Sequence, residues 1–99
     1  MGKKTIYKEE TTVDFKKPNM YKVILLNDDY TTMDFVVEIL IAIFHKTAAD
    51  ATRIMLDVHQ KGKGVVGVYT FDIARTKIAQ VEQMANERDF PLAAVMEPE

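Results

Sequence analysis

The sequence turns at Asn27-Asp28-Asp29-Tyr30-Thr31-Thr32-Met33, a polar stretch between the apolar runs 21–26 and 35–40. Asn and Asp favour turns because their short side chains hydrogen-bond nearby backbone groups and tolerate unusual dihedral angles. Thr31 precedes Asp34 by three residues, a spacing typical of a helix start. Residues 27–33, the corner, are therefore predicted to join a strand to a helix. Two carboxylates and an amide beside a helix start suit either a plain turn or a small recognition site.

The composition predicts one domain with one modest core. The chain has 99 residues, of which 47% are hydrophobic, so little surplus stability is expected at this size. Thirteen basic and 15 acidic side chains give a formal charge of −2. This charge offers no net attraction to nucleic acid or to an anionic membrane. The absence of cysteine excludes disulfides and thiolate chemistry, and suits a reducing compartment.

Residues 1–19 differ in composition from the rest of the chain. They contain five lysines, three acids and few apolar side chains, which predicts a flexible N-terminal extension before a core domain at 20–97. The first residues lack the apolar segment of a secretory signal. The longest apolar run, 39–44, is far shorter than the ~20 residues that cross a bilayer. We therefore expect a cytoplasmic protein that does not enter a membrane.

Hydrophobic patterns predict six elements. The first strand is apolar on both faces after Lys22, which indicates an interior position in a sheet. Thr47 and Gly62 mark the start and end of the second helix, Thr70 is expected to cap the third, and Pro91 must lie beyond its end. The expected elements are a strand at 20–26, a helix at about 32–46, a helix reaching about Lys61, a strand at 65–71, a third helix, and a strand at 92–96.

The order β-α-α-β-α-β favours an α+β fold. We expect a single small domain in which three helices pack on one side of a three-stranded antiparallel sheet. No internal repeat is present.

Gly62-Lys63-Gly64-Val65-Val66-Gly67 matches the pattern G-x-G-x-x-G of dinucleotide-binding loops. That motif needs a strand before it and a helix after it, so that the phosphates meet the helix N-terminus. Here a helix comes before the glycines and a strand follows them. We interpret the glycines as a helix stop and a tight entry into a strand, and expect no nucleotide cofactor.

Asp28, Asp29 and His59 are the residues from which a metal or hydrolytic site might be drawn. The chain has two histidines, no cysteine and no H-E-x-x-H pair, so a metal site is poorly supported. No serine is present as a nucleophile. The sequence therefore predicts neither an enzyme nor a bound metal. His59 lies at the border of an apolar helix face, where a histidine most often satisfies a nearby backbone group.

Six methionines are a mild excess for this length. Met33 lies at the mouth of the first predicted helix, and Met55 lies on the inner face of the second. A flexible, polarisable thioether suits a pocket that accepts several bulky side chains, but spacing alone does not separate this role from ordinary packing.

The chain resembles the ClpS family of adaptors, which hand substrates to the Clp protease. The resemblance covers residues 18–97 and is specific because many separated residues contribute to it. The matching residues are Met20-Tyr21-Lys22-Val23-Ile24-Leu25, Asn27-Asp28-Asp29-Tyr30-Thr31, Met33, Phe35-Val36, Ile54-Met55-Leu56, Val58-His59, Gly62, Gly67, Tyr69, Ala74, Thr76-Lys77 and Pro91-Leu92.

The resemblance implies an adaptor that binds proteins whose first residue is Leu, Phe, Trp or Tyr. The family delivers them to a ClpA-type AAA+ unfoldase for degradation. It implies that the substrate α-amino group is held, directly or through water, by Asn27, Asp28, Asp29 and His59. It also implies that the first side chain enters an apolar pocket formed by Thr31, Met33, Val36, Met55, Val58 and Leu92.

Unfoldase docking is less clearly implied. Lys77 is retained, but Asp72 and Arg75 both stand where many family members have Glu. Thr32 stands where the family often has Pro at the first helical position, which should lower preorganisation slightly. The extension resembles a family segment that takes part in delivery. We expect a monomer without cofactors. The alternative is a general interaction domain of similar fold, for instance one resembling the C-terminal domain of the ribosomal stalk protein, without specificity for the first residue.

Overall fold

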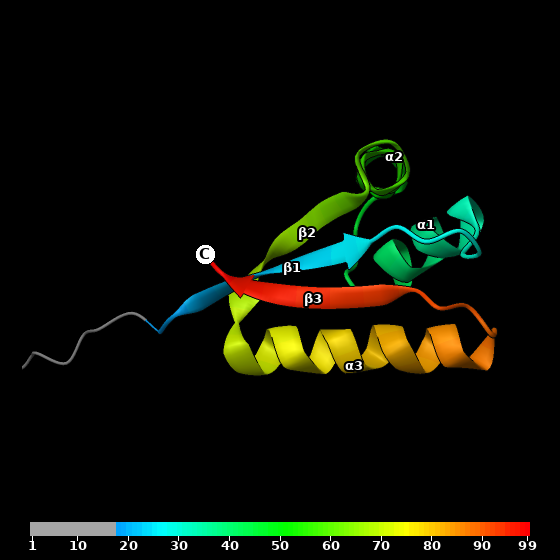
Figure 1. The fold of residues 1–99 in the computed structure, drawn as a ribbon. Coiled ribbons are helices and arrows are strands. Elements are labelled where there is room, and N and C mark those ends of the chain that lie inside the picture. Colours follow the sequence, from blue (N-terminus) through cyan, green and yellow to red (C-terminus); the bar gives the residue numbers. More distant parts are fainter. Residues whose placement is uncertain (1–17) are drawn as a thin grey trace, which may run out of the picture.

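Three helices pack on one side of a three-stranded sheet (Figure 1). The computed structural model describes residues 18–99, so residues 1–17 of the predicted extension lie outside the described residues. The predicted α+β fold and its element order are confirmed. The elements are β1 (Met20–Leu26), α1 (Met33–Ala42), α2 (Ala48–Lys61), β2 (Lys63–Thr70), α3 (Phe71–Glu87) and β3 (Ala93–Pro98).

β1 is the central strand of the sheet, as its apolar sequence predicted. The strand order is β2-β1-β3, and both neighbours pair with β1 in antiparallel register. Val23, Ile24 and Leu25 are at most 2% exposed, although their side chains alternate between the two faces. The register with β2 shifts between Val23 and Ile24, which leaves Val66 as the extra residue of a β-bulge.

The start of α1 differs from the prediction by one residue. Thr32, rather than Thr31, occupies the N-cap position, and its hydroxyl oxygen accepts a hydrogen bond of 3.1 Å from the Phe35 N–H. Thr31 instead donates its hydroxyl to Asp28 at 2.7 Å. Thr32 is therefore not the first helical residue, and its hydroxyl performs a capping role that a proline side chain lacks.

α1 also ends earlier than predicted, at Ala42 rather than near Lys46. The Lys46 N–H donates to the Leu40 carbonyl at 3.1 Å, and His45 has a positive φ of 57°. The His45 N–H donates to the Ile41 carbonyl at 3.2 Å, which is the hydrogen bond of an αL-type helix end, with His45 in the position that usually holds glycine. The predicted end was wrong because the sequence has no glycine to mark it.

α2 has the limits that the sequence predicted. Thr47 caps its start by accepting a hydrogen bond of 3.1 Å from the Asp50 N–H. Gly62 ends it in the left-handed conformation, with φ of 88°. Gly64 lets β2 approach the helix, because a Cβ there would lie 2.8 Å from Val58 Cγ2 and 3.0 Å from the Ile54 carbonyl oxygen. The predicted reading of these two glycines is confirmed.

The remaining boundaries shift by one or two residues. β2 begins at Lys63, and Phe71 belongs to α3 rather than to the strand. Thr70 occupies the N-cap position of α3, but its side chain makes no capping hydrogen bond. β3 runs from Ala93 to Pro98 rather than over 92–96.

One hydrophobic core lies between the sheet and the helices. Its largest fully buried side chains are Phe35, Leu25, Ile39, Leu40, Ile54, Val23 and Val81. All of these except Ile54 and Val81 come from β1 and α1, so these two elements form the centre of the core. Within residues 18–99, no helix is both long enough and apolar enough to cross a membrane.

Candidate functional site

The corner is ordered by the carboxylate of Asp28. Its Oδ1 accepts hydrogen bonds from the backbone N–H groups of Tyr30 at 2.8 Å and Thr31 at 2.7 Å. Its Oδ2 accepts the Thr31 hydroxyl at 2.7 Å. A carboxylate has about four lone-pair sites, so one acceptor position remains. Asp28 therefore holds the turn and has limited capacity for a ligand.

The same hydrogen bonds decide the charge state of Asp28. Partial burial, the largest influence, would raise the pKa of this carboxyl. The backbone and hydroxyl hydrogen bonds from Thr31, together with that from the Tyr30 N–H, act in the opposite direction, and the net pKa is lowered below its ordinary value of 3.8. Donors that point at the carboxylate stabilise its ionised form. The corner consequently carries this negative charge at neutral pH.

The end of α2 meets the corner through the backbone. The Asn27 N–H donates to the Gly62 carbonyl at 2.9 Å, and the Gly62 N–H donates to the Val58 carbonyl at 3.1 Å. His59 lies in the last turn of α2 and is exposed. The fold thus brings the end of α2, which carries His59, to the corner. Asn27 and Asp29 are also exposed, so all three side chains are accessible.

The six residues predicted to line an apolar pocket come from four parts of the chain. Val36 in α1, Val58 in α2 and Leu92 before β3 are at most 5% exposed and belong to one core cluster, against which Met55 packs. Thr31 is half-buried in the corner, whereas Met33 is 47% exposed at the first position of α1. Three predicted lining residues are therefore core residues, and Met33 lies at the surface.

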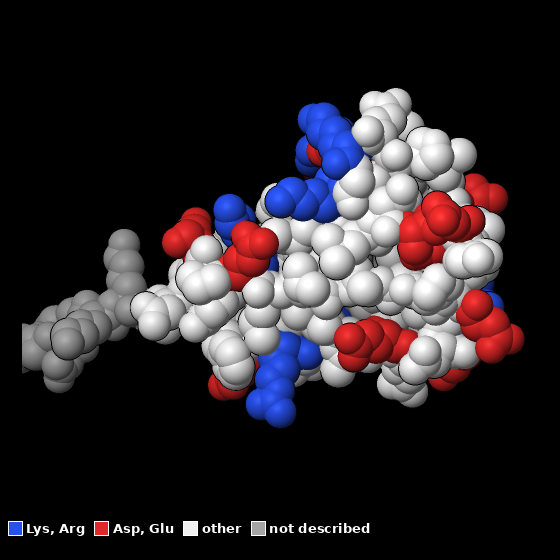
Figure 2. All heavy atoms as spheres, in the orientation of Figure 1, with Lys and Arg blue, Asp and Glu red and all other residues white. Residues whose placement is uncertain are grey.

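Acidic side chains predominate at one end of the molecule. Figure 2 shows them at the right-hand end, where Figure 1 places the corner and the last turn of α3. A cationic group is favoured near such a surface, because clustered charges of one sign raise the local concentration of their counterions.

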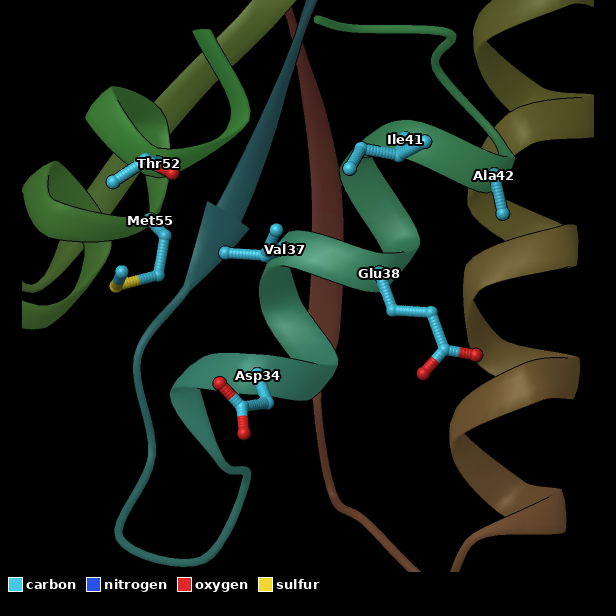
Figure 3. A pocket seen from close by; sticks show the side chains of 7 residues that line it. All are labelled: Asp34, Val37, Glu38, Ile41, Ala42, Thr52 and Met55. Carbon is cyan, nitrogen blue, oxygen red and sulfur yellow. The ribbon is translucent and has the colours of Figure 1, made fainter. Parts of the chain in front are cut away.

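A groove between α1 and α2 lies beside the predicted pocket (Figure 3). Its volume is about 630 Å³. It shares only Met55 with the predicted set, so the sequence prediction missed it. The missed residues of α1 recur at helical spacing and share one face, which is the signal that the sequence did contain. The lining residues are Asp34, Val37, Glu38, Ile41, Ala42, Thr52 and Met55.

The residues predicted to dock an unfoldase lie elsewhere. Asp72 and Arg75 are exposed in the first two turns of α3, at the end of the molecule opposite the corner (Figure 1). Lys77 is half-buried, and its Nζ donates to the Ile43 carbonyl at 2.7 Å, just after α1. Lys77 Nζ also lies 5.7 Å from the centre of the Phe44 ring. Lys77 therefore has a structural contact that the sequence did not indicate.

Within residues 18–99, no group of three or more His, Cys, Asp or Glu side chains is placed to hold a metal ion.

Comparison with known proteins identifies a family. The model of "ATP-dependent Clp protease adaptor protein ClpS" matches residues 16–95. The "ATP-dependent Clp protease adapter protein ClpS" of Acetivibrio thermocellus is 85% identical over 99 residues, which is the full length of both chains. The protein of the same name from Syntrophus aciditrophicus is 68% identical over 81 residues, 82% of this chain and 76% of that protein.

A solved structure agrees with these sequence matches. Agrobacterium tumefaciens ClpS2, bound to L-phenylalaninamide, has a TM-score of 0.81 and 42% sequence identity, covering 84% of this chain and 100% of that chain. The family model spans most of the described domain, and the relatives match over most of their own length. The chain belongs to the ClpS family of adaptor proteins of the ATP-dependent Clp protease.

Proposed function

We propose that this adaptor binds proteins with a free N-terminal Leu, Phe, Trp or Tyr and delivers them to a ClpA-type AAA+ unfoldase. The observation that carries the proposal is the L-phenylalaninamide bound to a relative of the same fold. That ligand has a free α-amino group and a bulky side chain, and its carboxamide stands in for the peptide bond to a second residue. It is therefore a minimal copy of a protein's first residue.

The corner supplies acceptors for the amine. An α-amino group has a reference pKa of about 7.7–8.0 and is largely cationic at neutral pH. The exposed side chains of Asn27, Asp29 and His59 can accept its hydrogen bonds, the last as a neutral imidazole. Asp28 keeps one acceptor position but chiefly orders the turn through Tyr30 and Thr31.

Two moderate contributions to the binding free energy, from the first side chain and from the α-amino group, are needed together for substrate binding. Burial of one large apolar side chain contributes about 1.5–3 kcal/mol. A hydrogen bond to a charged group contributes about 1.5–3 kcal/mol. After the cost of association, micromolar affinity requires both the amine and the side chain.

Fluorescence anisotropy with labelled peptides tests this dual requirement. A peptide that begins with Phe should bind, whereas its N-acetylated form should bind at least about 100-fold more weakly, because acetylation removes the charge and two donors. Asp29→Asn should weaken binding of the free peptide, and Asp50→Asn, which changes an exposed acid in the first turn of α2, should not. Equal affinity for the free and acetylated peptides would support the general interaction domain instead.

Met33 is proposed to exclude β-branched first residues. Its side chain is exposed at the start of α1, where a flexible thioether can close over an unbranched or aromatic side chain. Met33→Ala should therefore admit peptides that begin with Ile or Val while retaining those that begin with Phe. An unchanged preference, measured with the same set of peptides, would remove Met33 from this role.

Delivery is proposed to use the first turns of α3, with the participation of residues 1–19. Arg75→Ala is the informative variant, since Arg75 is exposed and its replacement should leave peptide affinity unchanged. Degradation of a Phe-first substrate by a reconstituted ClpA-type protease should slow in Arg75→Ala. Normal degradation would place docking elsewhere. Lys77 is less suitable for this test because it also contacts the Ile43 carbonyl.

A further inference from the structure

The groove between α1 and α2 has an apolar floor that the proposed pocket for the first residue does not use. Ile41 is 42% exposed, and Val37 and Met55 are half-buried. Val37 and Ile41 are four residues apart and lie on one face of α1. Figure 3 shows Val37 pointing toward α2, where Met55 lies. The floor is therefore formed by both helices.

The groove continues from the mouth of the proposed pocket. Met55 belongs to both, and Asp34, at the corner end of the groove, directly follows Met33 in α1. A substrate whose first side chain lies behind Met33 therefore finds this groove as the neighbouring concave surface. A volume of about 630 Å³ suits a few side chains, whereas a folded partner needs a much broader contact area.

We propose that this groove binds an apolar side chain at the fourth residue of the same substrate, an inference that rests on the proposed function. The point midway between Val37 and Ile41 lies six residues from Met33, or about 9 Å along the helix. An extended chain advances about 3.3 Å per residue, so three residues cover this distance. The fourth residue then lies over the apolar floor.

The charges around the groove disfavour an acidic occupant, and its apolar floor favours an uncharged one. Asp34 and Glu38 line it, and either would repel an acidic side chain. Glu38 is already paired with Arg88, whose Nη2 lies 2.7 Å from Glu38 Oε2. Among residues 18–99, no ion pair is recorded for Asp34. A Leu or Met side chain covers Val37, Ile41 and Met55 without a buried charge and gains affinity from the apolar area removed from water.

Two peptides that begin with Phe and differ only at the fourth residue, leucine or serine, test the inference by anisotropy. Partial burial of the leucine should give about 3- to 10-fold tighter binding. Ile41→Ser should remove this advantage and leave the affinity of the serine peptide within about twofold of wild type. Ile73→Ser is the matched control: Ile73 is 49% exposed, in the first turn of α3, and does not line the groove.

Nuclear magnetic resonance provides an independent readout. The methyl signals of Ile41 and Met55 should both shift with the leucine peptide, whereas the Ile41 signal should remain unchanged with the serine peptide. Equal affinities in the wild type, or a leucine advantage that survives in Ile41→Ser, would overturn the inference. Loss of binding of both peptides to the wild type would overturn the proposed function as well, so the two failures are distinguishable.

Discussion

The first two helices are stabilised in different ways. α2 carries its own signals: Thr47 caps its start, Gly62 ends it, and Lys61 pairs with Asp57 one turn earlier at 3.4 Å. α1 has a local cap at its start, Thr32, but it also depends on residues far along the chain. Its Phe35 packs against Phe90, with ring centroids 4.9 Å apart.

Further remote contacts flank α1. Arg88 makes an ion pair with Glu38 and lies 5.2 Å from the centre of the Phe35 ring. Lys77 reaches the Ile43 carbonyl after the last turn. The helix that opens at the corner is therefore positioned by α3 and the loop after it. A helix whose two ends are both marked by local signals can therefore be predicted from sequence, whereas the limits of a helix fixed by tertiary contacts can be predicted only in part.

Removal of the remote aromatic anchor should have the largest effect. Phe35 is 2% exposed and touches both Phe90 and Arg88. Phe35→Ala should lower the free energy of unfolding by about 3–5 kcal/mol, through lost burial and the cavity that remains. Urea denaturation measures this loss. Phe71→Ala is the control, because Phe71 is 43% exposed and its replacement should lower the free energy of unfolding far less. Equal losses in the two variants would show that α1 does not depend on this remote aromatic contact.

Removal of the cation beyond the end of α1 should have the next largest effect. Lys77→Met keeps most of the aliphatic chain but leaves the Ile43 carbonyl without its 2.7 Å donor. The expected loss of unfolding free energy is about 1–2 kcal/mol. Lys61→Met on α2 is the matched control. Its partner Asp57 is exposed enough to be solvated, so the substitution should hardly change the free energy of unfolding. If Lys77→Met leaves the free energy of unfolding unchanged, water can replace Lys77 as the donor to the Ile43 carbonyl.

The local cap of α2 is tested by Gly62→Ala. Gly62 has φ of 88°, and a Cβ at this position meets no atom within 4 Å. The substitution therefore isolates the backbone penalty of the left-handed region, about 1–2 kcal/mol, or near 1 kcal/mol if the turn relaxes. Thermal unfolding monitored by circular dichroism reports the change. An increase in stability would show that the αL conformation of Gly62 is not required.

The smallest effect is expected for the charge pair between α1 and α3. The side chains of Arg88 and Glu38 are 49% and 45% exposed, so solvent screens them and their coupling should be about 0.2–1 kcal/mol. A double-mutant cycle with Arg88→Gln and Glu38→Gln measures it. The pair Arg53–Asp50 within α2, 3.7 Å apart and more exposed, should give a smaller coupling. A stronger coupling for the α2 pair would show that ion pairs do not contribute to the dependence of α1 on remote residues.

The predicted boundaries agreed with the structure where local signals mark them and differed where such signals are missing. Strand β1 and both ends of α2 could be predicted because their apolar pattern, Thr47 and Gly62 are local signals. The end of α1 could not, because His45 takes the left-handed position without being glycine. The shift of the α1 cap from Thr31 to Thr32 follows from Asp28, which uses the Thr31 hydroxyl for the turn. Two adjacent threonines leave this choice open in sequence.

The residues assigned to the candidate site stay a prediction, and the sequence indicated only part of how they are arranged. Asn27, Asp29 and His59 are accessible, and the backbone contact between Asn27 and Gly62 brings the end of α2 to the corner. The sequence placed Met55 on the inner face of α2. It did not indicate that Met55 also borders a groove, because a groove depends on how two helices pack and not on the pattern of either.

By itself, the sequence determined the corner as a polar turn, the central strand, the local caps of α2 and the resemblance to the ClpS family. These features depend on side-chain chemistry and periodicity within a few residues. Only the tertiary structure determined that Asp28 is occupied by the turn, that α1 is held by Lys77 and Arg88, and that a groove opens beside Met55. The Asp28 contacts lie within three residues but depend on the detailed geometry of the turn, whereas the ion pair of α1 joins residues 50 positions apart. Periodicity encodes neither.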